Sequence, residues 1–356
     1  MKKQLYVLVA ACLGLQSCEK TSLEMQESGT SKILLQESSW KQLPDIITNF
    51  ERAGGERLTQ GFAFSIGSKG YVGSGGYENQ SLRVYDINSN TWTVLSPQLR
   101  PTAKPVAFTI GTMGYVGTGS RERGGDIFGS NELYQYDPVK DDYTLKTPLP
   151  ITLRGGVGFS INGKAYIGIG ITDVYRETET HSLENIYTPS NHFYEYSPGS
   201  DCWVRKADFP GEFRRDAVGF SIGDKGYVGT GFVEIGLQVE DKKSLKDFWE
   251  YDPAKDTWTK KADVPGPARH NAVGFGLANK GYVGTGETFR VSGPEILHKD
   301  FWEYDPSSNS WKQKEDFAGG GRNNLMYFTS STKAYMGGGG YIFSFNKDFW
   351  EFDPSK

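Results

Sequence analysis

One short motif recurs six times along the 356-residue chain and limits the possible folds more than any other feature. Each copy places an aromatic residue before a run of small residues: KGYVGSG at 69, MGYVGTG at 113, KAYIGIG at 164, KGYVGTG at 225, KGYVGTG at 280 and KAYMGGG at 333. The tyrosines of successive copies are 44, 51, 61, 55 and 53 residues apart. Such a period indicates one structural unit per repeat, with neighbouring units burying each other's apolar faces.

Two further segments flank each motif in a fixed order. An alternating apolar segment precedes it: GFAFSI at 61, PVAFTI at 105, GVGFSI at 156, AVGFSI at 217, AVGFGL at 272 and LMYFTS at 325. A segment with an aromatic residue, a turn and a second aromatic follows it: LRVYDINSNTW, LYQYDPVKDDY, FYEYSPGSDCW, FWEYDPAKDTW and FWEYDPSSNSW. The pattern predicts an antiparallel meander of four strands per repeat, which we name a to d, and an all-β fold.

The order and spacing of these segments resemble those of the kelch-repeat family, over residues 39–356. The resemblance implies one domain, a six-bladed β-propeller with four-stranded blades. The composition is typical of short strands and tight turns, since the chain has 45 Gly, 21 Phe, 20 Tyr and 8 Trp.

The two ends of the repeat region predict how the ring closes. The sixth copy begins as FWEFDPSK and ends before its strand-d aromatic, which would fall at position 359. Near the start, Ser39-Trp40-Lys41-Gln42 has no strand c before it and is similar to residues 309–313. We therefore expect Trp40 to supply strand d of the last blade, which would remove two exposed sheet edges.

The first residues have the features of an export signal. Lys2 and Lys3 precede an apolar run that is too short to span a bilayer as a mature helix. The run ends in Leu15-Gln16-Ser17-Cys18, which resembles the lipobox of bacterial lipoproteins. This predicts a signal peptide over residues 1–17, lipidation of Cys18 and a polar tether over 18–38. A plain secretory signal with an incidental cysteine is the alternative.

Charge and cysteine content narrow the expected partners. The formal net charge is −4 and no basic block appears, which argues against a nucleic-acid partner. After lipidation only Cys202 would remain as a thiol, so no internal disulfide is expected. We expect an exported outer-membrane lipoprotein, facing the periplasm or the cell surface, that is a monomer and binds no cofactor.

The connections between strands b and c differ most among the repeats. They run roughly over 76–81, 120–131, 171–191, 232–246, 287–299 and 340–346. Variable loops on a rigid scaffold commonly carry binding. The residues that lead into strand a fall on the same face, and their polar side chains suit hydroxyl and carboxylate ligands. The candidate ligand-binding residues are Arg154, Arg215, Asp216, His270, Asn271, Asn323 and Asn324.

Three further arginines precede strand a by one more residue. Arg214, Arg269 and Arg322 match a position where the kelch repeat commonly has arginine. The resemblance therefore implies a role in the scaffold rather than in ligand contact.

Two groups of enzymes that have kelch propellers suggest catalytic functions to compare with this sequence. The galactose oxidase-like kelch proteins have a copper-radical site with a Tyr–Cys crosslink. The only cysteine of the propeller region in this sequence, Cys202, lies in an outer strand, which argues against a copper oxidase. The bacterial N-acetylneuraminate epimerases are similar in blade number and export. That resemblance implies Glu287 and Arg290 as catalytic candidates, although their spacing differs from the one in that family. The alternative is that Glu287 is a solvated glutamate in a loop.

No metal-binding motif stands out in the sequence. The acidic segment 171–191 lacks the spacing of a calcium loop, so we expect it to be a solvated loop. The leading interpretation is a non-catalytic, lipid-anchored propeller that binds a carbohydrate or an extracytoplasmic protein through its b–c loops. The alternative is a sugar epimerase or mutarotase acting on a sialic acid-type substrate.

Overall fold

The computed structural model describes residues 22–23, 35–47, 58–75, 81–95, 99, 102–123, 126–177, 183–234, 241–340 and 346–356. Cys18 and the predicted signal peptide lie outside these residues. Among the residues described, no helix has the length and apolar character needed to cross a membrane.

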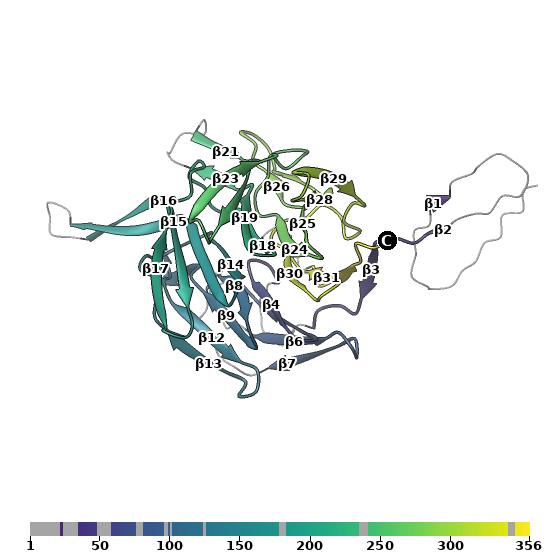
Figure 1. Ribbon diagram of the computed structural model, residues 1–356, viewed down its shortest axis with the longest axis horizontal. Coiled ribbons are helices and arrows are strands. Elements are labelled where there is room, and N and C mark those ends of the chain that lie inside the picture. Colours follow the sequence, from purple (N-terminus) through teal and green to yellow (C-terminus); the bar gives the residue numbers. More distant parts are fainter. Residues whose placement is uncertain are drawn as a thin grey trace, which may run out of the picture.

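Six antiparallel four-stranded sheets stand around a central axis (Figure 1). Blade 1 consists of β4 (Phe62–Ile66), β5 (Lys69–Gly73), β6 (Leu82–Asp86) and β7 (Thr91–Leu95). Blade 2 consists of β8 (Val106–Ile110), β9 (Met113–Gly117), β12 (Leu133–Asp137) and β13 (Asp142–Lys146). Blade 3 consists of β14 (Val157–Ile161), β15 (Lys164–Glu177), β16 (Leu183–Ser197) and β17 (Cys202–Lys206).

Blades 4 to 6 repeat the same order. Blade 4 consists of β18 (Val218–Ile222), β19 (Lys225–Gly229), β22 (Phe248–Asp252) and β23 (Thr257–Lys261). Blade 5 consists of β24 (Val273–Leu277), β25 (Lys280–Gly284), β28 (Phe301–Asp305) and β29 (Ser310–Lys314). Blade 6 consists of β30 (Met326–Thr329), β31 (Ala334–Gly337), β32 (Phe349–Phe352) and β3 (Trp40–Leu43). The predicted six-bladed propeller is confirmed.

The N-terminal strand closes the ring as predicted. Strand β3 pairs with β32, with Trp40 opposite Phe352. The Trp40 indole N–H donates at 3.2 Å to the carbonyl of Glu315, in the connection between blades 5 and 6. The tryptophans of the other outer strands donate in the same way to the connection before their own blade: Trp92 to Pro44, Trp203 to Thr147, Trp258 to Ala207 and Trp311 to Ala262.

Neighbouring blades pack through the glycine-tyrosine step of the recurring motif. In four blades the glycine faces the strand-a phenylalanine ring of the preceding blade, and a Cβ there would lie between 2.0 and 2.9 Å from that ring (Gly70, Gly114, Gly226 and Gly281). The tyrosine that follows stacks on the phenylalanine of its own blade, for example Phe275 on Tyr282 at 5.4 Å. The motif therefore encodes a close approach of blades that a larger side chain would prevent.

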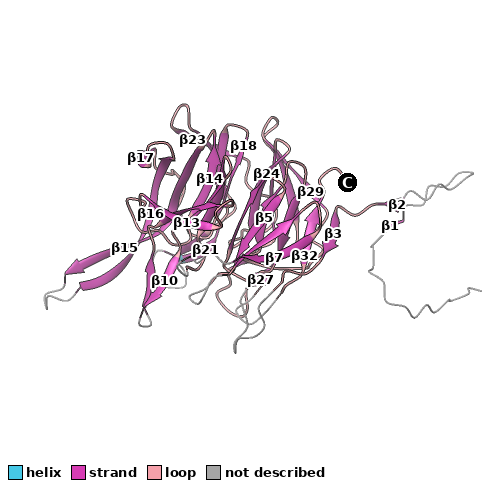
Figure 2. Ribbon diagram, turned by 90° about the horizontal axis from the view of Figure 1, so that it is seen from below, coloured by secondary structure: helices cyan, strands magenta, loops and turns pink. Residues whose placement is uncertain are grey.

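The b–c connections contain hairpins on one side of the disc (Figure 2). Three are short pairs: β10 (Ser120–Arg123) with β11 (Asp126–Gly129), β20 (Phe232–Glu234) with β21 (Lys242–Ser244), and β26 (Glu287–Thr288) with β27 (Ile296–Leu297). Outside the propeller, β1 (Ser22–Leu23) pairs with β2 (Leu35–Gln36), N-terminal to the ring.

The expectation of a solvated loop over 171–191 is wrong. Strands β15 and β16 continue outward as one long hairpin, in register from Gly170–Ser190 to Glu177–Leu183 after a bulge between Gly168 and Gly170. Asp173 of this hairpin is buried and forms an ion pair with Arg154 at 3.2 Å. The alternation of apolar and polar residues in ITDVYRE is compatible with a strand. The acidic residues of this segment had favoured a loop in the sequence-based prediction.

Candidate functional site

Six residues, one from each blade, surround the axis where strand a begins. They are Gln60, Lys104, Gly155, Asp216, Asn271 and Asn324, and each has a left-handed backbone with φ between 52° and 60°. Backbone hydrogen bonds connect neighbours, for example from Asn324 N–H to the Asn271 carbonyl at 3.0 Å. Asn, Asp and Gly tolerate this conformation best, which explains four of the six identities. Together these residues line a cavity of about 140 Å³ on the ring axis, and we call its opening the mouth.

The residue before the cavity position faces a b–c connection in four of the blades. In four blades it forms a β-bridge with the residue that begins the b–c connection: Ala103 with Ser120, Arg154 with Ile171, Arg215 with Phe232, and His270 with Glu287. In these four blades the residue before the cavity position therefore faces the variable connection of its own blade, and both positions lie on the b–c face as predicted.

Lys104 reaches across the mouth from blade 2. Its Nζ lies 2.8 Å from Asp216 Oδ1 of blade 4 and donates to Asn271 Oδ1 of blade 5 at 2.8 Å. Gly155 of blade 3, which lies between these blades, has no side chain, and a Cβ there would lie 3.1 Å from the Asp216 carboxylate. The missing side chain therefore leaves room for this bridge.

Two of the predicted arginines are bound to carboxylates within the protein. Arg215 forms an ion pair with Asp216 and another with Glu234 of β20, at 2.9 Å for the second. Arg154 is paired with Asp173 as described above. Burial alone would raise the pKa of Asp216, but the charges of Lys104 and Arg215 outweigh it and hold that pKa far below its usual range. These arginines accordingly hold the rim together, and their forks are already occupied.

A second group of side chains lies beside the cavity in blade 5. Glu287 begins β26 and is only 3% exposed. Asn271 Nδ2 donates to its Oε1 at 2.7 Å, and Asn323 Nδ2 of blade 6 donates to its Oε2 at 2.6 Å. The solvated alternative for Glu287 is therefore wrong, and its amide partners connect it to the cavity wall.

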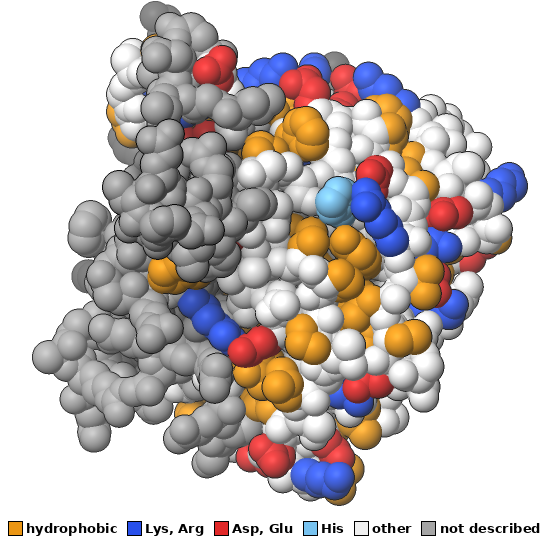
Figure 3. Space-filling model, turned by 90° about the vertical axis from the view of Figure 1, so that its left-hand side faces the viewer, with side chains coloured by type: hydrophobic (Ala, Val, Ile, Leu, Met, Phe, Trp, Pro, Cys, Tyr) orange, Lys and Arg blue, Asp and Glu red, His pale blue; other side chains and the backbone are white. Residues whose placement is uncertain are grey.

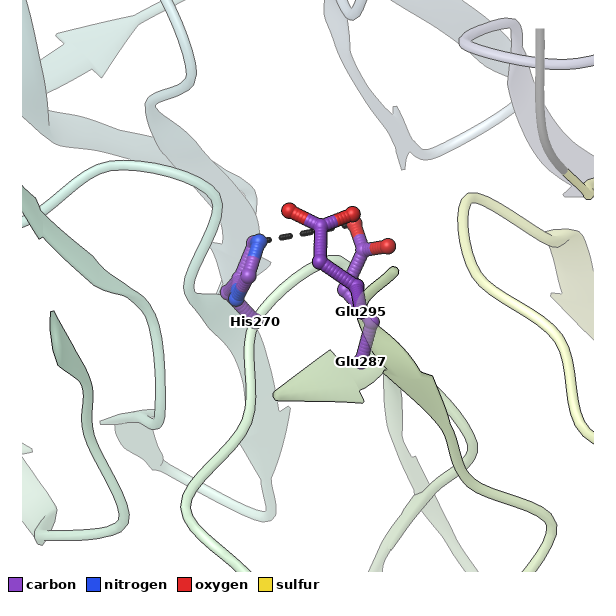
Figure 4. A group of neighbouring side chains, drawn as sticks. All are labelled: His270, Glu287 and Glu295. Atoms are coloured by element: carbon purple, nitrogen blue, oxygen red, sulfur yellow. Dashed lines mark ion pairs between the residues drawn. The ribbon is translucent and has the colours of Figure 1, made fainter. Parts of the chain in front are cut away.

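His270 and Glu295 complete this group, and Figure 4 shows the three side chains directed toward one another. His270 Nε2 lies 3.4 Å from Glu287 Oε1, and His270 Nδ1 lies 3.0 Å from Ser244 Oγ of β21. The Phe232 ring packs against the imidazole at 4.8 Å. Arg290, the other catalytic candidate, is exposed on the adjoining connection.

The environment moves the pKa values of both buried groups. Burial and the nearby Glu295 carboxyl raise the pKa of Glu287 to about 7, although hydrogen bonds from Asn271 and Asn323 act in the opposite direction. Burial lowers the pKa of His270 to about 4, so its imidazole is neutral at pH 7.

Comparison with known proteins places this geometry in context. No family model matches the chain. Over 154 residues it is 30% identical to an N-acetylneuraminate epimerase of Pasteurella multocida, covering 43% of this chain and 34% of that protein. It is 25% identical over 272 residues to Kelch-like protein 15 of Danio rerio, covering 72% of this chain and 42% of that protein. The chain thus matches less than half the length of these relatives.

The solved structure of YjhT superposes on the propeller with a TM-score of 0.68 at 16% identity, covering 86% of this chain and 95% of that one. The repeats, the six blades and these relatives agree. The chain is a kelch-repeat β-propeller.

The scaffold role predicted for three arginines of this kelch propeller fits what the structure shows. All three side chains are buried, and each guanidinium forms a bidentate ion pair with the aspartate that precedes strand c of its blade. The pairs are Arg214 with Asp247, Arg269 with Asp300, and Arg322 with Asp348. A tryptophan N–H donates to the same carboxylate in all three blades. These pairs tie the start of strand a to the start of strand c.

The seven predicted binding residues of the kelch propeller divide into two sets. Asp216, Asn271 and Asn324 line the cavity. Arg154, Arg215, His270 and Asn323 face the b–c connections, and the last two contact Glu287.

Sequence reasoning missed four side chains of the site, namely Gln60, Lys104, Ser244 and Glu295. Gln60 and Lys104 occupy the same repeat position as Asp216, so the alignment of repeats was a usable signal for both. Ser244 and Glu295 lie in connections that differ between blades, and no repeat pattern marks them.

Proposed function

We propose that this kelch propeller binds a hydroxyl-rich small ligand, a carbohydrate, in the cavity on its ring axis. The observation that carries the proposal is the ring of polar side chains, one per blade, held on a rigid backbone around that cavity. Lys104, Asp216 and Asn271 are bonded to one another, but the ammonium keeps a third donor, the carboxylate keeps lone pairs and the amide keeps a second N–H. The amides of Gln60 and Asn324 offer both donors and acceptors. Sugar hydroxyls need donors and acceptors in alternation, and this ring supplies them.

The size of the cavity supports a small ligand. About 140 Å³ is below the roughly 300–1,000 Å³ typical of pockets for drug-sized molecules. A single sugar ring is therefore a better match than a long oligosaccharide bound along its length. A glycan would enter by one terminal residue, with the rest of it against the b–c connections.

The test is a thermal-shift screen of monosaccharides, including sialic acid and galactose, in buffer that contains EDTA. A ligand at 100 times its Kd should stabilise the fold by about 2.7 kcal/mol. The Asn324→Gly variant removes a cavity amide and keeps the left-handed backbone, so it should reduce this shift. Asn162→Gly is the matched control, because Asn162 has a φ of 50° in an exposed turn between strands a and b. No shift with any sugar would refute the proposal.

A catalytic function is the second candidate, namely interconversion of sugar epimers or anomers. It is favoured by two relatives named N-acetylneuraminate epimerase, from Pasteurella multocida and Yersinia enterocolitica. It is also favoured by the buried carboxyl of Glu287 beside the His270 imidazole, one residue from the cavity. Turnover would be measured by NMR as exchange between the anomers of sialic acid. Glu287→Gln should abolish this exchange, and Arg290→Gln tests whether Arg290 takes part.

A protein partner is favoured by a separate feature, the long β15–β16 hairpin that projects beyond the other hairpins (Figures 1 and 2). Charges of both signs are interspersed with apolar side chains on the face shown in Figure 3, a mixture that suits a protein surface better than nucleic acid. Pull-down with the hairpin shortened to residues 170 and 190, against the full chain, would test this role.

The lipid anchor and the export that goes with it are part of the same proposal. Its basis is the Leu15-Gln16-Ser17-Cys18 segment. Labelling of cells with a palmitate analogue should mark the chain, and Cys18→Ser should remove the label. Labelling that persists in the variant would exclude Cys18 as the modified residue.

A further inference from the structure

Three potential metal ligands converge beside the cavity, from segments that are separate in sequence. His270 precedes β24, Glu287 begins β26, and Glu295 lies just before β27 (Figure 4). One ligand atom from each lies within 4.8 Å of the others. His270 and Glu287 are buried and Glu295 is partly buried, so the group differs from the exposed acidic clusters that are common on protein surfaces.

The spacing of the ligand atoms fits a first-row transition ion. With bonds of about 2.1 Å, two ligand atoms around a tetrahedral ion are about 3.4 Å apart, and opposite atoms around an octahedral ion about 4.2 Å. The distance from His270 Nε2 to Glu287 Oε1 is 3.4 Å. Small side-chain movements would therefore place all three groups on one ion.

Outer hydrogen bonds orient these groups as metal sites require. His270 Nδ1 faces Ser244 Oγ at 3.0 Å, and with the Nδ1 proton donated there, the Nε2 lone pair faces the two carboxyls. Ser244 Oγ also accepts the Phe289 N–H at 3.0 Å, which fixes its position. The amides of Asn271 and Asn323 hold the Glu287 carboxyl. Partners of this kind typically fix the ring and raise metal affinity.

The balance of charge supports a cation. The two nearest basic side chains of the rim, Lys104 and Arg215, are both engaged with Asp216. When both carboxyls are ionised, as metal binding requires, Glu287 and Glu295 carry a charge of −2, which one divalent ion neutralises. The mixed nitrogen and oxygen set suits zinc or manganese better than calcium, which prefers six to eight oxygens.

We propose that His270, Glu287 and Glu295 bind one divalent transition-metal ion, with zinc as the probe that matches the site best. Three protein ligands leave coordination positions for water or for an oxygen of a bound molecule. The site is separate from the sugar-binding proposal, because it needs no sugar to form and the sugar screen is run in EDTA.

The test is isothermal titration of the full chain with ZnCl₂ at pH 7, after EDTA treatment and removal of the chelator. We expect one equivalent of zinc. Glu295→Gln and His270→Gln should each weaken binding at least about tenfold, and Glu295→Gln should keep the fold because its side chain is only partly buried. Glu303→Gln and His192→Gln are the matched controls, since both residues are partly buried, as Glu295 is, and lie outside the group.

Three results would overturn the proposal. The first is no saturable zinc binding by the wild-type chain. The second is unchanged affinity in both Glu295→Gln and His270→Gln, with circular dichroism showing folded protein, which would place any zinc elsewhere. The third is calcium binding of equal affinity that His270→Gln leaves intact, which would exclude the imidazole as a ligand.

Discussion

Removing the Trp40 side chain tests ring closure at a single residue. Its ring is 5% exposed and lies 5.2 Å from Phe301, 5.0 Å from Phe317 and 4.8 Å from Phe352, so it joins blade 5 to blade 6. A buried aromatic side chain removes about 150–250 Å² from water, which at about 25 cal/mol per Å² corresponds to roughly 4–6 kcal/mol as an upper estimate. Substitutions of this type cost about 3–5 kcal/mol. We expect Trp40→Ala to lower the free energy of unfolding by about 4 kcal/mol.

The melting temperature should fall with it. Unfolding entropies near 2.1 cal/mol/K per residue, over roughly 320 residues, convert 4 kcal/mol into a decrease of about 6 °C. Differential scanning calorimetry and far-UV circular dichroism measure this without relying on tryptophan fluorescence, which the substitution changes. A single cooperative transition should persist, because the ring unfolds as one unit if its ends are coupled.

Trp311→Ala is the matched control. Trp311 occupies the same position in strand d of blade 5, and its indole N–H donates to the preceding connection as that of Trp40 does. If closure makes β3 an ordinary outer strand, the two substitutions should cost about the same. A loss below about 1 kcal/mol for Trp40→Ala, with a loss of 3–5 kcal/mol for Trp311→Ala, would refute the closure argument.

Three further predictions test the scaffold and the rim. Folding lowers the pKa of Asp216, so the stability that its carboxylate contributes is present above its unfolded pKa of about 3.9 and is lost as the pH falls below that value. In Asp216→Asn the urea midpoint should therefore decrease less steeply at acidic pH than it does in the wild type. Arg269→Met should cost about 3–5 kcal/mol in urea unfolding because it leaves the partly buried Asp300 carboxylate without its guanidinium partner, whereas the exposed Arg290→Met should stay within about 0.5 kcal/mol. Gly226→Ala should cost about 1–3 kcal/mol from overpacking, and Gly199→Ala, where a Cβ meets nothing within 4 Å, should be neutral in melting temperature.

The repeat made most of the fold predictable. Blade number, strand order and the role of Trp40 all follow from segments that recur in a fixed order. They recur because every blade packs between two neighbours in the same way and therefore needs the same residue types at the same positions. Where a blade departs from the pattern, the prediction failed. The β15–β16 hairpin extends an ordinary b–c connection into long strands, and the acidic residues within it suggested a loop.

The candidate site was predictable only in part, for the same physical reason. Positions that lead into strand a were found because the ring fixes them in every blade. Burial of Glu287 depends on Asn271, on Asn323 of the next blade and on the folding of its own hairpin, which local sequence does not encode. Glu295 joins the group only because β26 and β27 pair.

The equivalent positions of the blades show how this propeller separates scaffold from site. Glu287 occupies the bridge position that Ser120, Ile171 and Phe232 occupy in blades 2, 3 and 4, so the backbone there is the same whatever side chain it carries. A carboxyl at this position in blade 5 meets an imidazole from its own bridge partner, His270, because the bridge sets the two side by side. In blade 4 the same bridge brings Arg215 onto the Phe232 ring, with the guanidinium carbon 4.9 Å from the ring centroid. In these four blades the same backbone bridge therefore places a different pair of side chains together. Among the residues that the structure describes, the blade 5 pair with Glu295 is the group of His, Cys, Asp and Glu side chains whose spacing suits a cation.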